Sequence, residues 1–80
     1  MQITLYTTAG CHLCDLAEAI LVALPAHYHV EIIHTEIGDS DELVERYGIR
    51  IPVVKLPDNS EVDWPFEAQS IINTLNLSKW

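Results

Sequence analysis

Apolar and polar residues alternate with two different periods along the first half of the chain. Residues 2–7 and 27–37 alternate with a period of two, which is typical of strands that have one covered face. Residues 14–24 carry apolar side chains at helical spacing until Pro25 ends the pattern. We therefore predict a strand, a helix and a second strand, joined as a parallel β-α-β unit.

The second half of the chain predicts a short helix, a hairpin and a closing helix. Residues 39–42 supply cap groups and first-turn carboxylates for a helix that Gly48 should end as a left-handed residue. Residues 51–56 and 61–63 are predicted strands, separated by a Pro-Asp-Asn-Ser turn. Pro65 marks the start of the last helix. Its predicted buried stripe consists of Phe66, Ile71, Ile72 and Leu75.

These elements define an α/β fold with the order β-α-β-α-β-β-α, in which three helices flank a four-stranded mixed sheet. With 80 residues, 49% of them apolar, we expect residues 1–80 to form a single domain. Reactive groups at strand carboxyl ends and helix N-termini gather at one edge of such a sheet. That edge is therefore the expected place for chemistry.

Charge narrows the classes of partner. The formal net charge of −8 argues against binding to a nucleic-acid backbone or to an anionic membrane. The N-terminal residues predict a strand and not a signal peptide, and no apolar run approaches the roughly 20 residues that a bilayer span requires. We expect a monomer in a reducing cytoplasm.

Cys11 and Cys14 stand between the first strand and the first helix, with His12 and Leu13 between them. Unpaired N–H groups and the helix dipole favour a thiolate at a helix N-terminus. A disulfide that closes so short a loop would stabilise the fold by only about 2 kcal/mol in the chain-entropy model. We therefore predict redox chemistry and not two inert core thiols. In this hypothesis Cys11 attacks a partner disulfide, and Cys14, buried one turn further on, resolves the mixed disulfide.

Several residues near this pair have two interpretations each. His12 either favours the neighbouring thiolate when protonated or is a solvated residue at the start of a helix. Asp15 either interacts with the helix dipole or helps to deprotonate the resolving thiol; the first is favoured. Trp64 either presents an aromatic surface to a protein partner or belongs to the core, where Phe66 is expected.

Three histidines on one predicted strand, His27, His29 and His34, raise the question of a metal site. The cysteine pair is expected at the opposite end of the strands, so a four-ligand zinc site would be hard to assemble. We expect solvated histidines, and neither a metal nor another cofactor.

Three segments share their spacing with a known family: the strand 3–7 followed by residues 10–14, the segment 47–53, and the hairpin with its closing helix. Together they resemble the thioredoxin-like superfamily and, within it, the small glutaredoxin-like proteins. The resemblance implies a glutaredoxin-type fold and a protein-disulfide reductase. Its implied partners are a protein disulfide substrate and a reductase.

The resemblance also implies the substrate contacts. It implies a cis peptide bond between Ile51 and Pro52 that faces the cysteines, with the Ile51 backbone free to pair with an incoming peptide or glutathione. The other expected substrate contacts are His12, Leu13 and Trp64.

Three departures from the family pattern bear on glutathione. Members that use it usually have Lys shortly before the first cysteine and Thr before the cis proline, where this chain has Thr8 and Ile51. The segment before the last helix reads Asp-Trp-Pro-Phe (63–66) in place of Gly-Gly with an Asp. The carboxylates of glutathione would meet few donors here, so we expect a protein partner in preference to glutathione.

Two classes of function are compatible with this pattern. The first is a thiol-disulfide oxidoreductase or electron carrier that cycles Cys11 and Cys14 between dithiol and disulfide. The second is a binding module of the same fold, either an iron-sulfur carrier that uses Cys11 across a dimer or a non-catalytic scaffold. The presence of both cysteines favours the first class.

Overall fold

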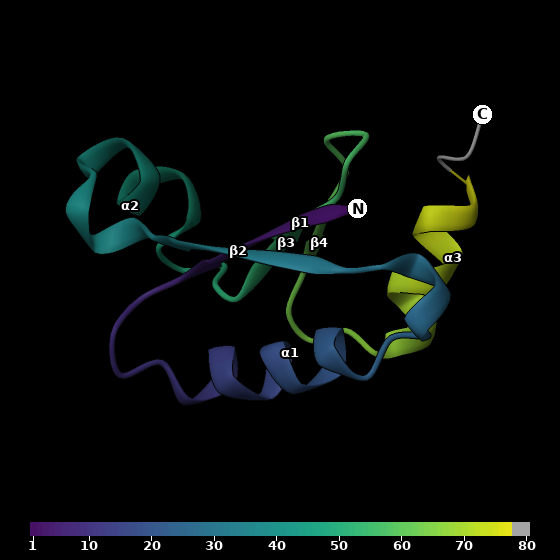
Figure 1. Cartoon of the computed structure of the whole chain (residues 1–80). Helices are drawn as coiled ribbons and strands as arrows, with labels where there is room; N and C mark the ends of the chain where they lie inside the picture. The colour runs from purple at the N-terminus through teal and green to yellow at the C-terminus, as the bar shows by residue number, and fades with distance from the viewer. Residues whose placement is uncertain (78–80) are drawn as a thin grey trace.

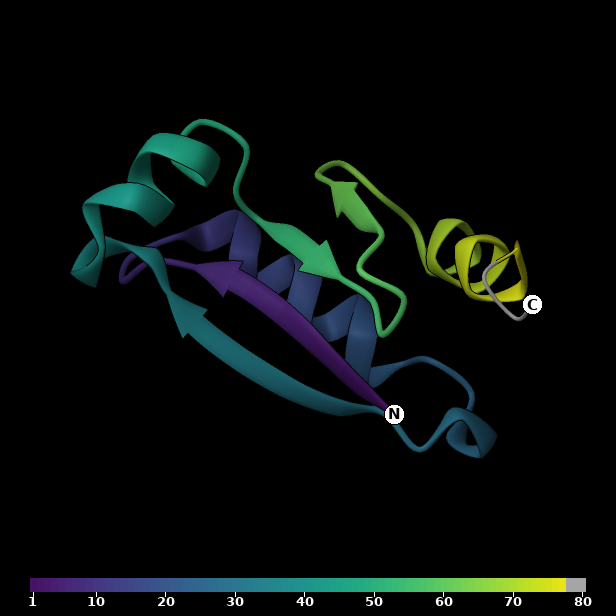
Figure 2. The ribbon, with the colours of Figure 1, turned by 90° about the horizontal axis from the view of Figure 1, so that it is seen from above.

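The computed structural model describes residues 1–77, and the strands of this part of the chain form one mixed sheet in the order β2-β1-β3-β4 (Figure 2). The strands are β1 (Gln2–Thr7), β2 (Glu31–Glu36), β3 (Val53–Lys55) and β4 (Glu61–Asp63). β1 runs parallel to β2 and antiparallel to β3, and β3 forms a hairpin with β4. The predicted α/β class and order of elements are confirmed.

Helix α1 (His12–Val22) lies below the sheet in Figure 1, and α2 (Asp41–Tyr47) lies above it. α3 (Ala68–Leu77) contributes to the same core as α1. Ser40, one of the predicted cap residues, is the N-cap of α2, because its hydroxyl accepts a hydrogen bond from the Leu43 N–H. Within residues 1–77, no helix is long and apolar enough to cross a bilayer.

Alternation along β1 divides the core into two clusters. Ile3 and Leu5 belong to the larger cluster, beneath the sheet, whereas Tyr6 belongs to the smaller cluster on the other face. The larger cluster also contains Ala17, Leu21, Leu24, Val54, Leu56, Phe66 and Ile71, and the smaller one Ile37, Tyr47 and Val53. Each face of the sheet therefore has its own apolar contact with a helix.

The predicted second strand, 27–37, is wrong at its start. Ala26–Tyr28 form a short 3-10 helix, and His29 follows with a left-handed φ of 50°. These conformations delay the strand to Glu31, whose N–H donates a hydrogen bond to the Met1 carbonyl. Two of the three histidines therefore precede the strand, and only His34 lies on it.

The predicted left-handed Gly48 is also wrong, because this residue continues the helical conformation with φ −52° and ψ −37°. Its N–H donates to the Val44 carbonyl at 2.8 Å. A Cβ atom at position 48 would lie only 2.4 Å from that carbonyl oxygen. The glycine is thus required for space and not for its backbone freedom.

Other boundaries also differ from the sequence prediction, including that of α1, which covers His12–Val22 where residues 14–24 were predicted. The third strand covers only Val53–Lys55, since Pro52 has no N–H to donate to a neighbouring strand. The last helix begins at Ala68 and not at Pro65, because its first turn is closed by N–H groups that donate to the Glu67 carbonyl. Phe66 is buried in the core, as predicted, but it precedes this helix.

Leu21 gives a direct test of the larger core, since it is fully buried on the face of α1 that meets the sheet. We expect Leu21→Ala to lower the free energy of unfolding by about 2–5 kcal/mol, measured by denaturant titration. Leu16→Ala is the matched control on the same helix, because Leu16 is 44% exposed. Equal losses in the two variants would contradict the assigned packing.

Candidate active site

Cys11 and Cys14 are joined by a disulfide at the N-terminus of α1, with their Cα atoms 5.3 Å apart. Cys11 is the N-cap residue, with an extended backbone at φ −79° and ψ 102°. Its Sγ accepts a hydrogen bond from the Cys14 N–H at 3.2 Å. The predicted pair is therefore within bonding reach, and the Cys11 sulfur lies at the positive end of the helix dipole.

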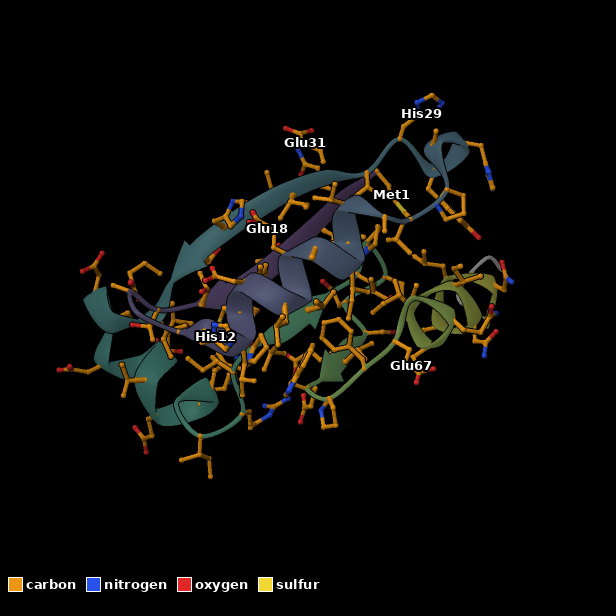
Figure 3. The ribbon with its side chains drawn as sticks, turned by 90° about the horizontal axis from the view of Figure 1, so that it is seen from below. Met1, His12, Glu18, His29, Glu31 and Glu67 are labelled. Carbon is orange, nitrogen blue, oxygen red and sulfur yellow. A yellow bond between two sulfur atoms is a disulfide. The ribbon has the colours of Figure 1, made fainter. Side chains whose placement is uncertain are left out.

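The two cysteines differ in burial. Cys14 is only 4% exposed, because it lies on the inner side of α1, whereas Cys11 is half-buried at the helix start. His12 and Leu13, between them, are both exposed. Figure 3 shows His12 at the start of α1, at the same end of the molecule as α2. An external reactant can therefore approach Cys11 more readily than Cys14.

The loop before Cys11 is held by backbone and carboxylate hydrogen bonds. Gly10 adopts a left-handed φ of 79°, which favours glycine, and the Cys11 N–H donates to the Thr8 carbonyl at 3.2 Å. The Glu36 carboxylate accepts from the N–H groups of Ala9 at 2.9 Å and Gly38 at 2.8 Å. Glu36 thus ties this loop to the end of β2.

These contacts change the ionisation of Glu36. Hydrogen bonds from the Gly38 N–H, the Thr8 hydroxyl and the Ala9 N–H, in that order of effect, lower the pKa of its carboxyl group. Our sequence reasoning missed this residue. The available signal was its place at the end of a strand predicted to pair with the strand before the cysteines.

The segment that contains Pro52 lies at the same edge of the sheet as the disulfide, because Val53 is aligned with Tyr6 near the end of β1. The expected cis bond between Ile51 and Pro52 is present, and a second cis bond, between Trp64 and Pro65, was not predicted. The Trp64 N–H donates to the Pro52 carbonyl at 3.1 Å, so the structure brings these two predicted contacts together. The half-buried Trp64 ring lies edge-on to Phe66, with centroids 5.2 Å apart.

The expectation for the Ile51 backbone is wrong in part. The Ile51 backbone was expected to be free for an incoming peptide, but its N–H donates to the Tyr47 carbonyl at 3.0 Å. The chain turns tightly at the end of α2, and the Arg50 N–H donates to the same oxygen at 2.8 Å. This donor of Ile51 is therefore already in use.

Arg50 links the segment before Pro52 to β4. Its guanidinium donates to both carboxylate oxygens of Asp63, at 3.1 and 2.8 Å, and to Glu61 at 3.0 Å. The Tyr47 hydroxyl donates to the other oxygen of Glu61 at 2.6 Å, and the Tyr47 ring stacks on Tyr6 with centroids 4.1 Å apart. Polar and aromatic contacts thus join α2 to the sheet.

The same contacts shift several pKa values. The bond from Arg50 lowers the pKa of Asp63, while the bond from Tyr47 and then that from Arg50 lower the pKa of Glu61. Burial, followed by the bond to Glu61, raises the pKa of Tyr47 to about 12. At neutral pH this edge therefore carries two ionised carboxylates that share one guanidinium.

The histidines do not form a metal centre in the described part of the chain. The His34 ring on β2 pairs with the Glu18 carboxylate on α1. No three histidine, cysteine or carboxylate side chains among residues 1–77 gather as metal ligands.

A β-α-β unit followed by a hairpin and a helix, with a disulfide at the first helix start, defines a thioredoxin-like protein with a Cys-X-X-Cys pair. A comparison with family models matches residues 2–76 to the glutaredoxin-like domain (DUF836). The chain belongs to this glutaredoxin-like family.

Two solved structures are similar to the chain, both of protein XcR50 from X. campestris, a Northeast Structural Genomics target. The X-ray structure has 34% sequence identity and a TM-score of 0.82, with 95% of this chain and 97% of that chain covered. The solution structure has 35% identity and a TM-score of 0.80, with 98% and 96% covered. A comparison with curated proteins found no match.

The paired carboxylates predict how stability depends on pH. Because the folded-state pKa values of Asp63 and Glu61 are depressed, their contribution is present near neutral pH and is lost as the pH falls below about 4. Arg50→Gln should lower the free energy of unfolding at pH 7 by up to about 1 kcal/mol and by a smaller amount at pH 2.5. Denaturant titrations at the two pH values measure this difference, and an equal loss at both would contradict it.

Proposed function

We propose that the protein is a thiol-disulfide oxidoreductase that reduces disulfides in partner proteins. The observation that carries the proposal is the disulfide at the N-terminus of α1, with Cys11 approachable and Cys14 buried. A structural role accounts poorly for it, because a disulfide across so short a loop adds little stability. Membership of a glutaredoxin-like family supports the same chemistry.

In the reduced protein, the Cys11 thiolate attacks one sulfur of the partner disulfide, and the other partner sulfur leaves as a thiolate. The Cys14 thiolate then attacks the Cys11 sulfur, which restores the internal disulfide and releases the second partner thiol. Two electrons pass from the protein to the partner. The Cys14 N–H and the dipole of α1 favour the attacking thiolate.

A second dithiol must return the electrons, and we propose a protein reductase in a reducing cytoplasm for this role. His12 and Leu13 are exposed between the cysteines, and Pro52 and Trp64 are hydrogen-bonded to each other at the same sheet edge. We assign these residues, with Ile51, to contact with the partner around the reacting sulfurs.

Reduction of insulin with dithiothreitol as the electron source tests the proposal. The intact protein should accelerate the turbidity that follows reduction, and Cys11→Ser should return the rate to the uncatalysed background. Reduced Cys14→Ser, freed of dithiothreitol before insulin is added, should accumulate a mixed disulfide with the substrate, detectable by mass spectrometry, because no resolving thiol remains. Activity that survives in Cys11→Ser, or a coloured, iron-containing protein without activity, would contradict the proposal.

The unequal burial of the two cysteines makes a separate prediction about labelling. In the reduced protein at neutral pH, iodoacetamide should modify Cys11 at least about tenfold faster than Cys14. Peptide mapping after timed quenching gives both rates. The urea-unfolded protein is the control, since unfolding should bring the two rates together; similar slow rates in the folded protein would count against the assigned roles.

A further inference from the structure

We infer that Glu36 makes the disulfide discriminate against anionic thiols, so that the preferred partner has neutral or cationic groups beside its reactive sulfur. This inference rests on the proposed function and adds the chemical class of the partner.

The strand register places Glu36 at the edge that carries the disulfide. Glu36 is aligned with Thr7, the last residue of β1, and the loop that leads to Cys11 leaves the sheet at that point. The carboxylate bonds the N–H of Ala9, two residues before Cys11. The negative charge is therefore fixed beside the loop that presents the attacking sulfur.

Three hydrogen-bond donors keep this carboxylate both oriented and ionised. The N–H groups of Ala9 and Gly38 and the Thr8 hydroxyl all favour the charged form. Glu36 also occupies the Ala9 N–H, a donor that a carboxylate of an approaching thiol would otherwise meet. An anionic thiol thus meets a full negative charge and loses a hydrogen-bond donor.

The cation on the other side of the edge does not offset this charge. Val53 is aligned with both Tyr6 and Asp63, so Asp63 lies at the same end of the sheet as the disulfide loop. Arg50 reaches this end, but its guanidinium is bound by Asp63 and Glu61. Arg50 is therefore not free to offset the charge of Glu36.

Small thiols of different charge measure this preference on the intact oxidised protein. The thiolate of the probe attacks the Cys11 sulfur, the internal S–S bond breaks, and Cys14 leaves as a thiolate. A second probe thiolate then attacks the probe sulfur of the mixed disulfide, that S–S bond breaks, and Cys11 leaves as a thiolate. Two probe thiols are thereby oxidised to their disulfide and the protein gains two electrons. The probes are anionic glutathione, uncharged 2-mercaptoethanol and cationic cysteamine.

Glu36→Gln removes the charge and keeps an amide of the same size. Relative to 2-mercaptoethanol, we expect the rate with glutathione to rise about two- to threefold and the rate with cysteamine to fall by a similar factor at low salt. Both changes should shrink towards unity at about 0.5 M salt because of screening. For each thiol, the rate with the variant is divided by the rate with the parent protein, so the intrinsic reactivity of that thiol cancels. These ratios are then compared with the ratio for 2-mercaptoethanol.

Two further variants separate charge from structure. Glu31→Gln is the matched control, because Glu31 starts the same strand at the opposite end, and Figure 3 shows it far from His12. It should leave the ratios unchanged. Glu36→Asp keeps the charge but shortens the side chain, so it should preserve the parental ratios even if all rates change together.

A uniform change with all three thiols in Glu36→Gln would overturn the inference and leave Glu36 as a purely structural tie. The same ratio shift in Glu31→Gln would also overturn it, because net charge alone would then be responsible. If no thiol reduced the parent protein, the proposed function itself would fail.

Discussion

The register of β1 against its two neighbours determines where the reactive groups lie. β1 is parallel to β2 and antiparallel to β3, so the end of β1, the end of β2 and the start of β3 share one edge. The register itself is fixed by burial: Ile3 and Leu5 must face the core beneath the sheet, while Tyr6 must face Tyr47 on the other side. A slip by one residue would exchange the two faces, and the disulfide loop would lose its position.

Local signals in the sequence predicted the parts of the fold that local physics controls. β1 and β4 have their predicted bounds, and Ser40 caps α2, because alternation, turn residues and caps act over a few positions. The conformation of residues 26–29 was not predicted. Alternation suggested a strand from residue 27, but the backbone there forms a 3-10 helix followed by a left-handed residue. The cis bond before Pro52 came from resemblance alone, because trans is the ordinary state.

The candidate site also contains some residues that local sequence signals predict and others that they do not. The cysteine pair is visible in the sequence because both residues lie on one helical turn. No local spacing marks Glu36 or Arg50, because their partners are distant: Ala9 is 27 positions from Glu36, and Asp63 is 13 positions from Arg50. Such contacts exist only after the strands have paired. The residues that set the electrostatics of the candidate site therefore depend on topology, whereas the cysteine pair is marked by local spacing.

The contacts that position Cys11 do not require the bond between the sulfurs. The Cys14 N–H bonds to the Cys11 sulfur as a helix cap, the Cys11 N–H bonds to Thr8, and Glu36 holds the loop. Each of these contacts can persist after reduction, when the sulfur becomes a stronger acceptor as a thiolate. The backbone can thus keep one conformation with and without the disulfide, so the proposed electron transfer would require little reorganisation. In a small domain whose β3 and β4 have only three residues each, this arrangement would keep the proposed chemistry from disturbing the fold.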